Sequence, residues 1–343
     1  MLYIIMDTCE KVLTVPQITA VCWYSSILTI CFYSQYMRLL LKNKVKFISN
    51  PDEFQKLFIN IINSNFIESN IGNPDDIVRH IGTPEYILHT LNKLDSSWFN
   101  ICPIQHQDGY FPSFYIHRML NIFIPYEKIL YLDQLPDNSY IISSNFLKDY
   151  VYSNNIQDKT HIQNISHLMN TININYLLGN IDVIIISTLP SNYKNIDALK
   201  QVNMYFPIDI KPPCNETLFI NSKQYKLDSV ILSNYNTQMY NGSHSIAGIT
   251  CHNNKYLYNG WTNTTNDPAK QFNSTFTETC KLFPFDWTHP TKNPFYLSNT
   301  SCNFSPVYFD LSAPLSNLCF HFNYGNNLHI YVNKNFSNLT FVD

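Results

Sequence analysis

Apolar residues recur at helical spacing through the first part of the chain. Residues 22–41 contain neither Pro nor Gly, and cations such as Lys44 follow them, which suits a helix C-terminus. A second helix is predicted over 51–66, where Pro and acidic residues occupy the first turn. A third is predicted over 83–94, where apolar residues return every three or four positions. We therefore expect residues 1–120 to form a mainly helical lobe.

Beyond that lobe, short apolar runs are bounded by turn residues, which is the pattern of β-strands. The runs on either side of His252-Asn253-Asn254 predict a hairpin. The predicted strands are 122–125, 129–132, 140–142, 181–187, 226–234, 246–251, 255–261 and 328–332. Residues 290–305 are expected to be loop. The sequence thus predicts an α+β protein with a helical lobe at 1–120, a mainly β lobe at 121–265 and an extension at 266–343 packed on the β lobe.

Composition excludes several classes of function. The chain has 343 residues, 45% of them hydrophobic, which is enough to bury a substantial core. Its net charge is -3 and no long basic run occurs, so no nucleic acid partner is expected. Only 8 glycines are present and no phosphate-binding fingerprint occurs, so no cofactor is predicted. His and Cys residues lack the spacing of a zinc site, so no metal is predicted either. We expect a monomer.

The 9 cysteines are an odd number and widely spread in a chain too large to need disulfides, which favours a reducing, cytoplasmic compartment. Cys9, Cys31, Cys102 and Cys251 are interpreted as small buried hydrophobic residues. Asn-x-Ser/Thr sequences leave a secretory alternative open, although a chain so rich in these residue types supplies most of them by chance.

A membrane helix is a rival interpretation of the N-terminal region. Residues 12–37 carry no charge and are long enough to cross a bilayer. Pro16, Gln17, Gln35 and several hydroxyl residues interrupt this stretch. The sequence therefore favours a buried core helix over a membrane anchor.

Cys22, His244 and Asn259 are the candidate catalytic residues. A catalytic thiol needs an imidazole partner and gains from a helix N-terminus, because both favour the thiolate. Pro16 discourages an earlier helix start, which places Cys22 near the first turn. Cysteine, histidine and asparagine follow one another in the order of a papain-like site.

The predicted hairpin brings the other two residues together. His244 begins one of its strands and Asn259 ends the other, so that Asn259 can accept from the imidazole N–H and fix its tautomer. Asn263 is the substitute for Asn259. Gln17 lies five residues before Cys22, where its side-chain amide can donate to the oxyanion of a tetrahedral intermediate.

These segments resemble those of ubiquitin-specific proteases. Residues 16–26 (PQITAVCWYSS) look like the cysteine box, and 225–231 (YKLDSVI) followed by 243–248 (SHSIAG) look like the histidine box. Residues 255–260 (KYLYNG) fall on the stretch that carries the third catalytic residue. The chain as a whole is similar to the divergent predicted cysteine proteases of large cytoplasmic DNA viruses.

The resemblance implies a papain-like fold of two lobes, with Cys22 as nucleophile, His244 as base, Asn259 orienting it and Gln17 at the oxyanion. The implied substrate is ubiquitin or a ubiquitin-like modifier on a conjugate, cleaved in the host cytoplasm or the virion. The alternatives are a viral precursor-processing protease, a catalytically silent ubiquitin-binding module and a membrane-anchored structural protein.

Overall fold

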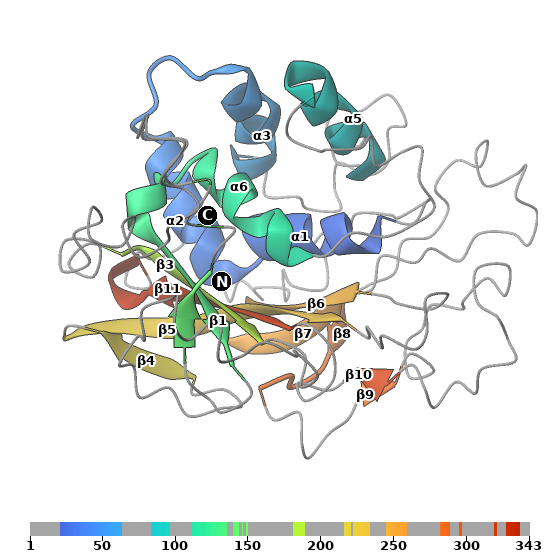
Figure 1. Ribbon diagram of the computed structural model, residues 1–343, viewed down its shortest axis with the longest axis vertical. Helices are drawn as coiled ribbons and strands as arrows, with labels where there is room; N and C mark the ends of the chain where they lie inside the picture. The colour runs from blue at the N-terminus through green and yellow to red at the C-terminus, as the bar shows by residue number, and fades with distance from the viewer. Residues whose placement is uncertain are drawn as a thin grey trace, which may run out of the picture.

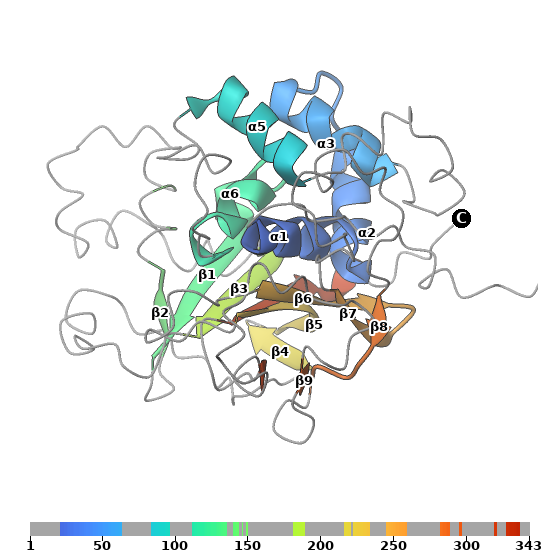
Figure 2. The same ribbon diagram turned by 90° about the vertical axis from the view of Figure 1, so that its right-hand side faces the viewer.

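A computed structural model describes the parts of the chain that form its core. The described residues are 21–63, 84–96, 112–135, 140–143, 146, 149, 181–188, 216–220, 222–233, 245–258, 282–288, 295–296, 319–320 and 327–336. Within them, helices cover one face of a mixed β-sheet (Figure 1). A view from the side shows α1 lying along the sheet above β6 and β5, with α3 and α5 farther out (Figure 2).

The described helices form two levels on this face. The elements α1, α2 and α6 lie next to the sheet, and α3 packs on α2 and on α5. The α-helices are α1 Cys22–Phe32, α2 Gln35–Val45, α3 Glu53–Asn63, α5 Pro84–Leu94 and α6 Ile116–Asn121, and the 3-10 turns are η4 Pro112–Phe114, η5 Tyr126–Lys128 and η10 Lys334–Phe336.

The single long helix predicted over 22–41 is wrong, because the chain breaks at Ser34. This residue is extended, with φ -70° and ψ 141°, and it separates α1 from α2. Its hydroxyl donates to the backbone oxygen of Asp228 at 2.9 Å and accepts from the backbone N–H of Thr250 at 3.1 Å. Tertiary hydrogen bonds to the sheet therefore override a local pattern that lacks any helix breaker.

The described strands belong mainly to one sheet, in the order β2-β1-β3-β11-β5-β6-β7-β8, with β4 also paired to β5. Only β1 and β3 are parallel, and the remaining pairs are antiparallel. The strands are β1 Ile129–Gln134, β2 Tyr140–Ile142, β3 Val183–Thr188, β4 Thr217–Ile220, β5 Lys223–Ser233, β6 Ser245–Cys251, β7 Asn254–Tyr258, β8 Phe283–Pro284 and β11 Leu328–Asn333, beside a separate pair formed by β9 Phe295–Tyr296 and β10 Cys319–Phe320.

The predicted hairpin is confirmed by the pairing of β6 with β7. Cys251 pairs with Asn254 across a turn formed by His252 and Asn253. Both turn residues have positive φ, 46° and 63°, as a two-residue turn that matches the twist of a hairpin requires. Asn tolerates this conformation better than most residues.

Other predictions are corrected. Residues 122–125 are not a strand, because the backbone N–H groups of Phe123 and Ile124 bond back to Leu120 and continue the turn that ends α6. The expected loop at 290–305 contains β9, and the sequence pattern did not reveal β4 or α6. The segment 266–343, interpreted as an extension, supplies β11, which lies between β3 and β5 inside the sheet.

The protein is therefore a mixed α+β fold with a central, mostly antiparallel sheet. Its core fills the space between helices and sheet, and Trp23 is fully buried there. Trp287 packs so closely on β6 that a Cβ atom at Gly248 would lie 2.8 Å from its indole ring, so only glycine fits at that position. Among the described helices, none has the length and apolar character needed to span a bilayer.

Candidate active site around Cys22

Cys22 is the first residue of α1, as the sequence predicted. The helix begins after Val21, whose side chain makes no capping hydrogen bond, and the backbone N–H groups of Tyr24 and Ser25 bond to the Val21 carbonyl. The N-terminal end of a helix carries partial positive charge. The backbone N–H groups of Cys22 and Trp23, at this end of α1, act on the Cys22 thiol.

The fold brings Cys22 to the start of β6. The backbone N–H groups of Ser245, Trp23 and Cys22 lie close enough to the thiol to favour its thiolate form. Ser245 is the first residue of β6 and directly follows His244 in the sequence. Two segments more than two hundred residues apart therefore meet at one sulfur atom.

Burial decides the protonation state of this thiol. Cys22 is only 9% exposed, and burial raises its pKa to about 11, against the pull of the backbone N–H groups of Ser245, Trp23 and Cys22, which favour the thiolate. The resting group is thus a neutral thiol at neutral pH. A nucleophilic reaction of this sulfur needs a base that takes its proton during attack.

The other predicted catalytic residues, Gln17, His244 and Asn259, lie outside the described residues. The elements beside two of them are described. Asn259 directly follows Tyr258, the last residue of β7, and Tyr258 pairs with Ala247 of β6.

A polar row that sequence reasoning missed crosses the sheet at the Cys22 end. The hydroxyls of Ser245 and Ser233 lie 2.9 Å apart, and the side-chain oxygen of Asn327 accepts from the backbone N–H of Ser233 at 3.2 Å. Asn327 in turn exchanges hydrogen bonds with Thr188. The row connects β6, β5, the residue just before β11 and β3, and no local signal marks it because its members come from four separate segments.

The remaining described cysteines differ from Cys22. Cys31 is free, lies in the last turn of α1, and has a thiol pKa that burial raises far above its ordinary value, so the interpretation as a buried hydrophobic residue is confirmed. Cys9 and Cys102 lie outside the described residues. Cys251 is also buried in the core, as predicted, but it is disulfide-bonded and not a free thiol. Its partner is neither Cys22 nor Cys31, since both are free. This disulfide opposes the expectation that all the cysteines stay reduced.

Trp23 belongs to the hydrophobic core. Its side chain is 1% exposed and its ring lies 5.0 Å from that of Tyr115, between centroids. This contact fixes the start of α1 against the helical layer.

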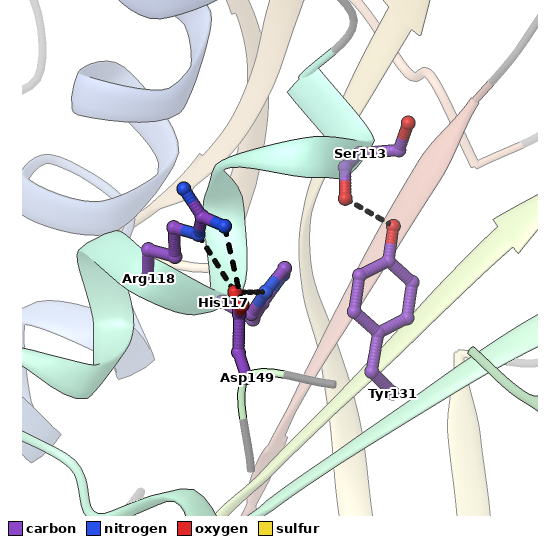
Figure 3. A network of polar contacts seen from close by, with 5 residues as sticks. All are labelled: Ser113, His117, Arg118, Tyr131 and Asp149. Atoms are coloured by element: carbon purple, nitrogen blue, oxygen red, sulfur yellow. Dashed lines mark hydrogen bonds and ion pairs between the residues drawn. The ribbon is translucent and has the colours of Figure 1, made fainter. Parts of the chain in front are cut away.

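A partly buried polar network ties α6 to Asp149 (Figure 3). Arg118 binds the Asp149 carboxylate through two nitrogens, at 2.6 and 3.1 Å, and His117 Nε2 lies 2.7 Å from the same carboxylate. Tyr131 on β1 donates to the backbone oxygen of Ser113 at 3.0 Å. The His117 ring is fully buried among aromatic side chains, which is the setting of a structural histidine.

A cavity of about 760 Å³ opens at the far end of β6 from Cys22. It arises because β4 and β6 pair with the same edge of β5 and diverge between Leu227 and Val230. Lys255 bridges this gap, with its ammonium 2.8 Å from the Thr250 hydroxyl and 4.5 Å from the Trp287 ring centroid. Within the described residues, no group of three or more His, Cys, Asp or Glu side chains is placed to hold a metal ion.

No protein-family model matches the chain, and no curated protein matches it.

Proposed function

We propose that the protein is a cysteine-dependent peptidase or isopeptidase that removes ubiquitin or a ubiquitin-like modifier. One observation carries the proposal: the Cys22 thiol lies at the start of α1 against the backbone N–H of Ser245, next in sequence to His244. A cysteine from one segment meeting the histidine segment of another is the arrangement that a thiol–imidazole pair requires. The resemblance of both segments to ubiquitin-specific proteases supplies the substrate class and the papain-like assignment.

The proposed reaction begins with a neutral pair. The Cys22 sulfur attacks the scissile carbonyl carbon while His244 takes the thiol proton, which fits a thiol whose pKa burial raises to about 11. His244 then gives this proton to the leaving amine, and water hydrolyses the thioester in a second half-reaction. The Cys22 backbone N–H and Gln17 are proposed to stabilise the oxyanion, and Asn259 to orient the imidazole.

Covalent labelling with ubiquitin that carries a C-terminal electrophile tests the proposal. We expect one adduct with the wild-type chain and none with Cys22→Ala or His244→Ala. Cys31→Ala is the matched control, because Cys31 is a second free, buried cysteine on the same helix. Adduct formation that persists in Cys22→Ala, or that needs Cys31, would contradict the assignment of the nucleophile.

The burial of Cys22 favours a second candidate, a catalytically silent module that binds ubiquitin. Such a module keeps the fold but leaves its thiol protonated and covered. It predicts that iodoacetamide modifies Cys22 no faster than Cys31, whereas unmodified ubiquitin still binds, as titration calorimetry measures. A precursor-processing protease instead predicts a reactive Cys22 together with failure of the ubiquitin probe.

We place the activity in the cytoplasm of a host cell or in the virion, as the resemblance suggests. The disulfide of Cys251 bears on this point, because cytoplasmic reductants keep most thiols reduced. Blocking free thiols in intact cells before mass spectrometry tests the location. A fully oxidised Cys251 in cells would point to an oxidising compartment and against the cytoplasm.

A further inference from the structure

Asp228 caps a helix that is far away in sequence. The backbone N–H groups of Tyr36 and Met37, in the first turn of α2, donate to its two carboxylate oxygens, each at 3.0 Å. Ser34, at the N-cap position of α2, makes no side-chain capping hydrogen bond. The carboxylate from β5 therefore satisfies two N–H groups that the helix itself leaves without partners.

An irregularity in β5 accompanies this contact. The pairing of β5 with β11 shifts register between Ile330 and Tyr331, whose partners are Ser229 and Leu227, so Asp228 is the extra residue. Such bulges re-aim a side chain out of the regular alternation of a strand. Here the bulged residue is the one whose carboxylate caps α2.

The hydroxyls of Ser34 and Thr250 complete the contact. The Ser34 hydroxyl donates to the Asp228 backbone oxygen and accepts from the Thr250 N–H. The Thr250 hydroxyl donates to the same oxygen at 2.6 Å. We call Ser34, Asp228 and Thr250 the α2 clamp, since together they fix the α1–α2 corner to both β5 and β6.

The α2 clamp and Cys22 lie at opposite ends of the same two elements. Helix α1 runs from Cys22 toward Ser34 and is about 16 Å long at the usual helical rise. Strand β6 runs beside it from Ser245 to Thr250, about 17 Å at the usual strand rise. The pair meets at Cys22 and Ser245 at one end and at Ser34 and Thr250 at the other.

This geometry makes the clamp a pivot. A tilt of about 5° at one end of α1 moves its other end by more than about 1 Å, and a misplacement of that size costs up to about 100-fold in rate. From these contacts we infer that the α2 clamp is a positioning device that sets the placement of the Cys22 thiol relative to the start of β6. The inference rests on the proposed function for its effect on catalysis.

Replacing the Thr250 hydroxyl tests the clamp without deleting volume. Thr250→Val removes the hydrogen bond to the Asp228 oxygen and the one that Lys255 donates, while Thr250→Ser keeps the hydroxyl. Thr29→Val is the matched control, because Thr29 is a buried threonine on α1 whose hydroxyl bonds only within its helix, to the Ser25 oxygen at 2.7 Å. Asp228→Asn tests the carboxylate itself, since an amide offers one acceptor to two N–H donors.

Two measurements on the full chain separate the outcomes. We expect Thr250→Val and Asp228→Asn to lower kcat for a ubiquitin C-terminal amide by about 10-fold or more with KM nearly unchanged, as loss of positioning predicts. We also expect them to change the pH profile of iodoacetamide modification at Cys22. Thr250→Ser should restore both within about threefold, and Thr29→Val should match the wild type.

An unchanged kcat and an unchanged alkylation profile in Thr250→Val and Asp228→Asn would overturn the inference. Equal losses in Thr29→Val would overturn it too, because they would reveal general destabilisation. A wild-type chain without turnover defeats the proposed function alone. In that case the alkylation profile of Cys22 still decides whether the clamp sets the position of the thiol.

Discussion

Two carboxylates hold helices in this protein, and their pKa values move in opposite directions. Asp228 is fully buried and accepts from two backbone N–H groups, yet burial dominates and raises its pKa to about 6. Asp149 is partly exposed and binds Arg118 and His117, which hold its pKa below the ordinary value despite partial burial. The amide donors and the charge of Lys255 do not outweigh the desolvation of the fully buried Asp228, whereas Arg118 and His117, bonded directly to the less buried Asp149, do.

The two carboxylates also differ in the structural role that each contact can fill. An Arg–carboxylate pair stabilises locally and responds to salt, because part of it meets solvent. A buried carboxylate that accepts hydrogen bonds from backbone amides costs free energy to ionise, but it holds the two segments that it joins in one relative position. The second kind suits a contact whose purpose is to position α2 relative to β5 and β6.

The largest expected effect is the pH dependence of stability. The pKa of Asp228 rises from 3.8 to about 6 on folding, so its contribution is fully present below about pH 4 and is lost as pH rises through 6. At about 1.4 kcal/mol per pKa unit, this amounts to about 3 kcal/mol. The contribution of Asp149 depends on pH in the opposite direction. Because its pKa is lowered on folding, Asp149 stabilises the protein at pH values above the ordinary pKa of an aspartate, and this stabilisation is lost as the pH falls below that pKa.

Denaturant unfolding between pH 3 and 7 measures both contributions. We expect the difference between wild type and Asp228→Asn to change by about 3 kcal/mol across pH 4 to 7. The stability difference between wild type and Asp149→Asn should change only below pH 4. Taking differences matters, since burial also raises the pKa of Asp133 to about 7, which adds a slope of the same sign to every variant. A pH-independent difference for Asp228→Asn would break the comparison.

A smaller effect is expected from truncation at neutral pH. Asp228→Ala leaves the N–H groups of Tyr36 and Met37 buried without an acceptor, and we expect a loss of about 2 kcal/mol after relief of the buried charge. Asp149→Ala lets Arg118 turn to solvent, and only the buried His117 loses a partner that water cannot replace. We therefore expect the free energy of unfolding to fall by about 1 kcal/mol. Urea unfolding at pH 7 measures both. A larger loss at Asp149 would show that the charged network, not the amide cap, holds its helix more firmly.

The smallest expected effect on stability comes from replacing the guanidinium of Arg118 by an ammonium group. Arg118→Lys keeps the charge beside Asp149 but loses the paired nitrogens, and we expect a loss of about 0.5–1 kcal/mol that shrinks in 0.5 M salt. Lys56→Arg is the control, since Lys56 contacts Glu53 on an exposed helix face. Thermal unfolding at two salt concentrations measures this. A loss that salt leaves unchanged would mean that packing of the Arg118 side chain, rather than its ion pair, matters.

Local pattern predicted most of the described elements because each of them has its own periodicity. The helices α3 and α5 begin near Pro and acidic residues, and β6 and β7 flank a turn whose residues tolerate positive φ. The break at Ser34 escaped prediction because its cause lies in Asp228 and Thr250, about two hundred residues away. The prediction of a strand at 122–125 was wrong because apolar residues in the turn that ends a helix have the same sequence pattern as a short strand.

The candidate site was partly predictable for a related reason. The position of Cys22 at a helix start follows from nearby Pro and from the helical pattern, and the structure agrees. The closeness of Cys22 to Ser245 could be predicted only by assuming that the segment containing His244 belongs to the same site. The pKa of about 11 was not predictable, because burial depends on what the remote segments place over the thiol. The α2 clamp depends on a bulge, which a strand sequence does not reveal.

The central place of β11 governs when this protein can fold during synthesis. Residues 328–333 insert between β3 and β5, so the described strands on either side of β11 have no direct pairing to join them until these residues have been synthesised. Until then β3 and β5 each expose an unpaired edge, and such edges invite association with other chains. The nascent chain is therefore sensitive to aggregation from the synthesis of β3 until that of β11, and chaperone demand should fall once β11 emerges.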